Sequence, residues 1–247
     1  MDRVWSLCPA AYALLFAALA PSPRAALMAA LATLWAARLT YNFARKGGFS
    51  KIEAANEDYR WPVLRGWFAA ALPPALLVPA REAFHLLFVC AYQNVLLYLI
   101  VVPACVAVAA RGAALGLAPA DGLLAAGFLL LLAGEAVTDE QQWAFQARKH
   151  ALSPKARQAA GGDLARGFLT TGVFAYSRHL NFACEQGLWV AFYGFAVVAR
   201  APGGDVAALV RAQGAGALLT PAALGPALLM MLFQGSTWMT EVITAEK

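Results

Sequence analysis

Five polar or charged side chains stand at the entrance of a long apolar run in the second half of the chain. They lie in the segment GFLTTGVFAYSRHLNFACE and are Tyr176, Arg178, His179, Asn181 and Glu185. Polar groups at a bilayer boundary cost free energy unless they are paired or solvated, so they indicate a working site by default. Asparagine and glutamate one helical turn apart can hold an amide or a ribose hydroxyl, and arginines can hold phosphate. The alternative is hydrogen bonding between membrane helices.

A second polar face precedes this segment. Glu135, Asp139, Gln142 and Gln146 follow one another at helical steps of four, three and four, so they share one face of a helix. For Asp139 and the glutamines, a solvated helix exit is the alternative interpretation. Glu135 follows the apolar stretch LLLLAG and is expected to lie deeper, where a carboxylate needs a donor. We expect Arg178 to be that donor.

A third group closes an apolar run in the first half of the chain. Arg38, Tyr41, Asn42 and Arg45 are typical of an interface where cations extend toward water and aromatic rings sit at headgroup level. Tyr41 is also a candidate to give a hydrogen bond or a proton to a lipid-embedded carbonyl.

Composition tells which elements must position these residues. The 247 residues are 61% hydrophobic and 13% charged, with a mean hydropathy of +0.60, whereas a soluble domain carries about 25% charged residues. We therefore predict one integral membrane domain over residues 1–247, an all-α bundle of about six to seven transmembrane helices. A helix crosses a bilayer with roughly 20 apolar residues. Windows of about this kind are Val4–Ala20, Ala25–Phe43, Phe84–Ala110, Gly122–Val137, Ala183–Val198 and Ala217–Phe233.

One further apolar stretch does not fit this pattern. Trp67–Ala80 is interrupted by Pro73, Pro74 and Pro79, and we expect it to be a re-entrant or interfacial piece, or a partial seventh span.

The basic residues predict an orientation. With the amino terminus inside, 14 lysines and arginines fall on the inner side and 4 on the outer side, and Arg38 falls within a helix end. This asymmetry obeys the positive-inside rule, so both termini are expected on the cytoplasmic side. The net charge of +5 is then a topology signal and requires no nucleic-acid partner.

Several functions have no support in the sequence. The three histidines and four cysteines lack ligand spacing, so no metal site is predicted. The chain has no GxGxxG, GxxxxGK[ST], HExxH or GxSxG motif. A dinucleotide would therefore have to be held by helix ends and loop arginines.

The segments RLTYNFARKGGFS, EDYRW, TDEQQWAFQ, GVFAYSRHLNF and GSTWMTEVI together resemble the DUF1295 branch of the steroid 5α-reductase superfamily. The resemblance runs from about Arg38 to Glu246. It implies a helical membrane enzyme that uses NADPH to reduce a C=C bond conjugated to a carbonyl in a hydrophobic lipid or steroid-like substrate. Membrane lipids and that substrate are the expected partners.

The resemblance also implies roles for single residues. Tyr41 matches the catalytic tyrosine that polarises the enone oxygen. The cofactor-binding positions are Glu135, Asp139, Tyr176, Arg178, Asn181 and Glu185.

Two other functions stay open at this point. The protein is alternatively a non-catalytic accessory subunit of a larger membrane complex that keeps the fold, because Val4–Ala20 contains no carboxylate where steroid reductases have an acid. A third alternative is an S-adenosylmethionine-dependent methyltransferase, since isoprenylcysteine-modifying relatives carry a similar element around Arg178–Glu185.

Overall fold

The computed structural model describes residues 4–49, 60–110 and 116–245, and these contain helices and no strand. Residues 50–59 of the first inner loop lie outside the described residues, as do Arg3, Arg111 and Lys247. The α-helices are α1 (Leu7–Leu19), α2 (Pro23–Arg45), α3 (Arg60–Ala71), α4 (Pro74–Phe84), α5 (Gln93–Leu99), α6 (Val102–Ala109), α7 (Pro119–Ala151), α8 (Pro154–Ala160), α9 (Gly162–Arg166), α10 (Leu180–Arg200), α11 (Val206–Gln213) and α12 (Leu224–Ala245). A π-helix, η2 (His85–Tyr92), joins α4 to α5, and short 3₁₀ turns η4 (Gly172–Ala175), η5 (Pro202–Gly204), η6 (Ala215–Leu218) and η7 (Pro221–Ala223) complete the set.

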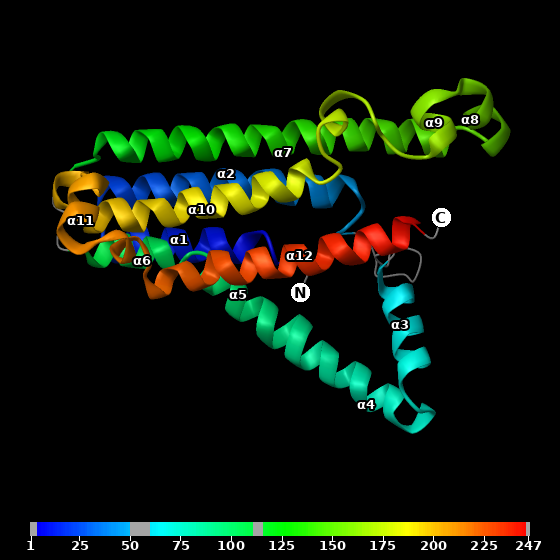
Figure 1. Cartoon of the computed structure of the whole chain (residues 1–247), viewed down its shortest axis with the longest axis horizontal. Helices are drawn as coiled ribbons and strands as arrows, with labels where there is room; N and C mark the ends of the chain where they lie inside the picture. Colours follow the sequence, from blue (N-terminus) through cyan, green and yellow to red (C-terminus); the bar gives the residue numbers. More distant parts are fainter. Residues whose placement is uncertain (1–3, 50–59, 111–115, 246–247) are drawn as a thin grey trace.

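The long helices run side by side in one bundle (Figure 1). Within the described residues, three helical stretches are long and apolar enough to cross a membrane: Pro74–Ala109, Pro119–Ala151 and Leu180–Arg200. The predicted all-α membrane bundle is confirmed. Helix α10 lies at its centre, with 56% of its most apolar window buried against 17% for that of α7, and it packs on α7, α6 and α12.

The helices differ from the expected apolar stretches at two places. The stretch Trp67–Ala80 is not one unit, because α3 ends at Ala71 and a new helical stretch begins at Pro74 and continues to Ala109. Proline is favoured at a first helical position, where its missing N–H costs nothing. Pro79 lies inside α4, and the π-helical hydrogen bonding of η2 follows directly. The last window was placed too early: its helix starts at Leu224, after η7.

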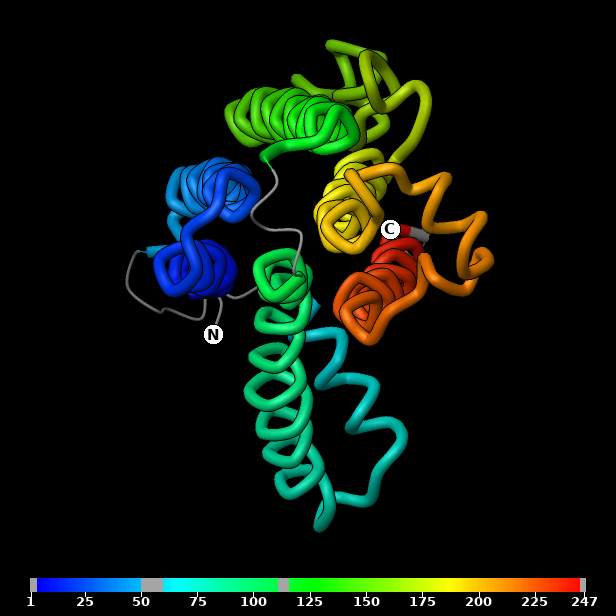
Figure 2. The backbone as a smooth tube through the Cα atoms, turned by 90° about the vertical axis from the view of Figure 1, so that its left-hand side faces the viewer, coloured from blue at the N-terminus to red at the C-terminus, as the bar shows by residue number. Residues whose placement is uncertain are grey.

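Helices α3, α4 and η2 form an arm that leaves the bundle (Figure 2). None of their residues is buried. The first helix of the arm, α3, contacts α12. The rings of Trp67 and Trp238 lie 5.8 Å apart, and Arg60 Nη1 donates to Ser236 Oγ at 3.0 Å.

Ion pairs join α2 to α7 at both of their ends. At one end, Arg24 makes a bidentate pair with Asp121, Nε to Oδ1 and Nη2 to Oδ2, both at 2.8 Å. Both side chains are buried, and Asp121 also accepts the Ala118 N–H at 2.7 Å. Every oxygen of this carboxylate therefore has a donor. The opposite end of the two helices holds the candidate site.

Gly225, near the start of α12, packs closely against the backbone at the end of α5. A Cβ on Gly225 would lie 2.2 Å from the carbonyl oxygen of Leu99 and 2.7 Å from the nitrogen of Ile100. Because these are backbone atoms, α12 would have to move. We expect Gly225→Ala to lower the free energy of unfolding by about 1–3 kcal/mol, as measured by thermal unfolding in detergent.

The matched control is Gly235→Ala on the same helix, where a Cβ meets nothing within 4 Å. It should be neutral or slightly stabilising, since alanine is favoured over glycine in a helix. Equal losses in both variants would contradict the close approach at Gly225.

Candidate functional site

Three helices that are distant in sequence bring charged side chains to one buried point. Arg38 lies on α2, Glu135 and Asp139 lie one turn apart on α7, and Glu185 lies in the first half of α10. Gly134 permits the close approach of α10 to α7, because a Cβ there would be 2.9 Å from the Sγ of Cys184.

The guanidinium of Arg38 is shared among three carboxylates. Its Nη1 donates to Asp139 Oδ2 at 2.7 Å. Its Nη2 lies 3.2 Å from Glu135 Oε2 and 3.7 Å from Glu185 Oε2. We call these four residues the Arg38 centre. Glu135 is only 3% exposed, whereas Arg38 and Asp139 are each 14% exposed, so the centre reaches solvent on their side.

Two indoles fix the third carboxylate. Trp35 Nε1 donates to Glu185 Oε2 at 2.9 Å and lies 3.1 Å from Oε1, while Trp189 Nε1 donates to Oε1 at 2.8 Å. The two rings meet edge to face, with centroids 5.0 Å apart, and both are fully buried. Indole N–H groups in an apolar core need acceptors, so Glu185 serves the packing of the core as well as the Arg38 centre.

Two atoms of the centre have no hydrogen-bond partner. They are the Nε of Arg38, a donor, and the Oε2 of Glu135, an acceptor. The 3.2 Å approach of Nη2 to Glu135 Oε2 is an ion pair by distance, but its direction does not make a hydrogen bond. Unsatisfied polar atoms are costly in a protein interior. Each of these two atoms can therefore take one further hydrogen-bond partner.

The exposed side of the centre is basic and aromatic. Arg45 donates to Asn42 Oδ1 at 3.0 Å and to Glu140 at 2.5 Å. Its guanidinium lies over the rings of Tyr41 and Trp143, 5.4 and 5.0 Å from their centroids. The Tyr41 side chain is 65% exposed. The candidate catalytic tyrosine thus lies on the rim and not within the buried centre.

The expected donor for Glu135 was wrong. Arg178 pairs with Glu241 on α12, Nη1 to Oε2 at 2.9 Å, and the Nε2 of His179 lies 2.6 Å from the other oxygen. Arg38 takes the role instead. The position of Arg38 in the sequence is typical of a helix-end cation, although a charge near the end of an apolar window is itself a signal for a carboxylate partner.

The six cofactor candidates therefore divide. The structure brings Glu135, Asp139 and Glu185 together. It places Arg178 in the pair with Glu241, and Tyr176 is 91% exposed. Asn181 is half-buried one turn before Glu185 on α10.

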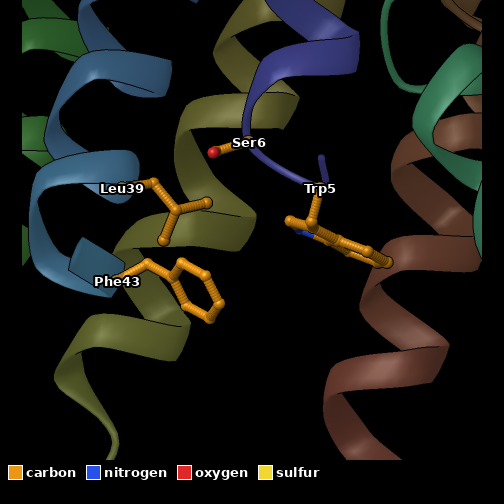
Figure 3. A pocket seen from close by; sticks show the side chains of 4 residues that line it. All are labelled: Trp5, Ser6, Leu39 and Phe43. Carbon is orange, nitrogen blue, oxygen red and sulfur yellow. The ribbon is translucent and has the colours of Figure 1, made fainter. Parts of the chain in front are cut away.

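A small open pocket lies beside the same end of α2 (Figure 3). Leu39 and Phe43 of α2 line it together with Trp5 and Ser6 at the start of α1. The Ser6 hydroxyl is hydrogen-bonded to Thr40 at 2.6 Å. The lining is otherwise apolar, which suits a hydrocarbon chain.

The loop between α9 and η4 is closed by Asp163. Its carboxylate accepts the Thr170 hydroxyl at 2.6 Å, the Thr170 N–H at 3.0 Å and the Thr171 hydroxyl at 2.8 Å. These hydrogen bonds, first of all those from Thr170, lower the pKa of Asp163 from its ordinary 3.8 to about 2. The charged form is the one that the loop binds.

The loop should therefore open in acid. A carboxylate with a lowered pKa stabilises the fold above the unfolded pKa of 3.8 and ceases to do so as pH falls toward 2. We expect exchange of the Thr170 amide hydrogen to accelerate over this pH range relative to other amides. Asp163→Asn should exchange faster at neutral pH and lose this pH dependence. A parent profile identical to that of the variant would contradict the assignment.

Among the described residues, no group of three or more His, Cys, Asp or Glu side chains is arranged to hold a metal ion.

The profile of a protein family described as "Protein of unknown function (DUF1295)" matches residues 1–213. An uncharacterized protein of Schizosaccharomyces pombe is 34% identical over 258 aligned positions, which cover 100% of this chain and 67% of that protein. No solved structure matches the chain.

Proposed function

Because the chain belongs to the DUF1295 family, whose members are steroid 5α-reductase-like, we propose that it is an NADPH-dependent reductase. Its substrate is a hydrophobic lipid or steroid-like molecule, in which it reduces a C=C bond conjugated to a carbonyl. The observation that carries the proposal is the Arg38 centre, a buried and incompletely paired group of charges inside a membrane bundle. Intramembrane charges are expensive, and they are kept where they bind or transport something.

Two features of the Arg38 centre support the choice of NADPH as cofactor. The unfilled Nε–H of Arg38 requires an acceptor, and the oxygen of a nicotinamide carboxamide is one. Asp139, at the exposed edge of the centre, is suited to accept an amide N–H or a ribose hydroxyl. The bound cofactor would supply the hydride that adds to the β-carbon of the enone.

The side chains of the rim complete the proposed site. Arg45 and Lys46 offer cations for phosphate on the exposed side of the centre. The Tyr41 hydroxyl donates to the enone oxygen, which stabilises the charge that develops there when hydride arrives. The Arg45 guanidinium over the Tyr41 ring holds this side chain near the rim. The predicted excess of basic residues on the inner side supports a cytoplasmic position for the rim.

Binding of NADPH to detergent-solubilised protein tests this proposal, with energy transfer from tryptophan to the cofactor as the signal. The parent protein should bind. Arg38→Lys, which keeps the charge and removes the Nε–H, should weaken binding roughly tenfold or more, the effect of losing one charge-assisted hydrogen bond. S-adenosylmethionine should not compete.

Arg24→Lys is the matched control, because Arg24 also makes a buried ion pair between α2 and α7. Within the described residues, no buried nitrogen of Arg24 lacks a hydrogen-bond partner. It should bind NADPH as the parent does. Absence of binding by the parent, or equal weakening in both lysine variants, would contradict the proposal.

The arm formed by α3, α4 and η2 favours a second candidate function. Its lack of buried residues suits a non-catalytic accessory subunit that contacts another membrane protein through the arm. The same titration separates the two functions when it is combined with native mass spectrometry of protein extracted in mild detergent. A stoichiometric partner without NADPH binding supports the accessory function.

A further inference from the structure

We propose that Glu135 and Glu185 share one proton, so that the Arg38 centre is a proton-binding site within the membrane bundle. The inference concerns the protein without cofactor and stands apart from the proposed reduction. It follows from the charges, the unfilled oxygen and the unequal surroundings of the three carboxylates.

The charges around the centre do not balance when all its carboxylates are ionised. Helix α7 brings Glu135, Asp139 and Glu140, and α10 brings Glu185. Helix α2 brings Arg38 and Arg45, and Lys46 follows it near enough to attract Asp139. Arg45 is paired with Glu140. Arg38 and Lys46 then face three carboxylates, which leaves one negative charge without a counter-charge. Just before α10, Arg178 and His179 pair with Glu241 and so do not compensate the charge of the Arg38 centre.

The unfilled oxygen shows where a proton belongs. Glu135 Oε2 and Glu185 Oε2 both face the same nitrogen, Arg38 Nη2, at 3.2 and 3.7 Å. Ionised carboxylates only accept hydrogen bonds, so two of them at one place leave an oxygen without a donor. Glu135 Oε2 is that oxygen. A proton on it turns the acceptor into a donor toward Glu185 and removes the excess charge in the same step.

The three carboxylates differ in how well their charge is compensated. Glu185 accepts hydrogen bonds from two indoles. Asp139 has the shortest contact with Arg38 and is partly solvated. Glu135 is 3% exposed, and the 3.2 Å ion pair with Arg38 is its compensation. The shared proton therefore lies mainly on Glu135, and it exchanges with solvent through the exposed edge at Asp139.

Infrared spectroscopy of the purified protein in lipid nanodiscs, without nucleotide, tests the inference. At neutral pH the parent should show the C=O stretching band of a protonated carboxyl group, which shifts in D₂O. Glu135→Gln should remove the band. Glu185→Gln should also remove it, because the amide then donates to Glu135 in place of the proton. Asp121→Asn, at the fully paired Arg24, should leave the band unchanged.

A stability measurement accompanies the spectra. If Glu135 is already neutral, glutamine replaces it with little change in shape or charge. The melting temperature of Glu135→Gln should then lie within a few degrees of that of the parent at neutral pH. An ionised Glu135 would instead make Glu135→Gln lose an ion pair and melt much lower. A band that is absent at neutral pH, or that persists in Glu135→Gln, overturns the inference, and so does stability that depends on added Na⁺ or K⁺ instead of on protonation.

Discussion

Replacement of Arg38 by methionine is expected to lower the free energy of unfolding by about 3–5 kcal/mol, the usual cost of removing one partner from a buried ion pair. Methionine fills a similar volume but removes the guanidinium that Glu135, Asp139 and Glu185 share. The measurement is thermal or denaturant unfolding in detergent, followed by circular dichroism.

Two comparisons make this result specific. Arg24→Met removes the cation from a single carboxylate, Asp121. It should therefore lower the free energy of unfolding by less than Arg38→Met does. Neutralising the acids of the centre in the Arg38→Met background, with Glu135→Gln, Asp139→Asn and Glu185→Gln, should restore a large part of the stability. Arg38→Met that unfolds like the parent would show that Arg38 does not hold the three carboxylates.

Glu185→Leu is expected to lower the free energy of unfolding by about 2–4 kcal/mol, since each buried N–H left without an acceptor costs about 1–3 kcal/mol. Trp35 and Trp189 are both fully buried and both donate to Glu185. Glu185→Gln keeps an acceptor oxygen and should cost less. Denaturant unfolding followed by circular dichroism measures the stability of both variants.

Glu140→Gln is the control for a carboxylate on the surface. Glu140 is 65% exposed and pairs with Arg45, so the change should cost less than about 1 kcal/mol. Equal stability of Glu185→Leu and Glu185→Gln would mean that the indoles do not depend on this carboxylate.

Much of the fold could be predicted because the bilayer imposes one simple rule. Apolar stretches near 20 residues in length become helices, and α2, α7 and α10 each contain the window that was expected there. The start of the Pro74–Ala109 stretch could not be predicted, because three prolines look like breaks while only the one at Pro73 ends up outside a helix. Proline inside a membrane helix is tolerated when neighbouring groups adjust, and the sequence does not display those groups.

The candidate site was predicted on its acidic side only. Glu135, Asp139 and Glu185 could be found because a carboxylate near an apolar run is costly wherever it lies. The choice of partner depends on which helices touch, and the sequence does not display those contacts. The sequence favoured Arg178, whereas in the structure the guanidinium of Arg38 on α2 lies within 3.7 Å of all three acids.

The decisive measurement for the proposed reductase is a structure of the protein determined with saturating NADPH. We expect nucleotide density beside α7 and α10, with the carboxamide oxygen of the nicotinamide within hydrogen-bond distance of Arg38 Nε and the phosphates toward Arg45 and Lys46. An Arg38 centre closed on itself, with no nucleotide density near it, would mean that the protein does not hold NADPH at this place.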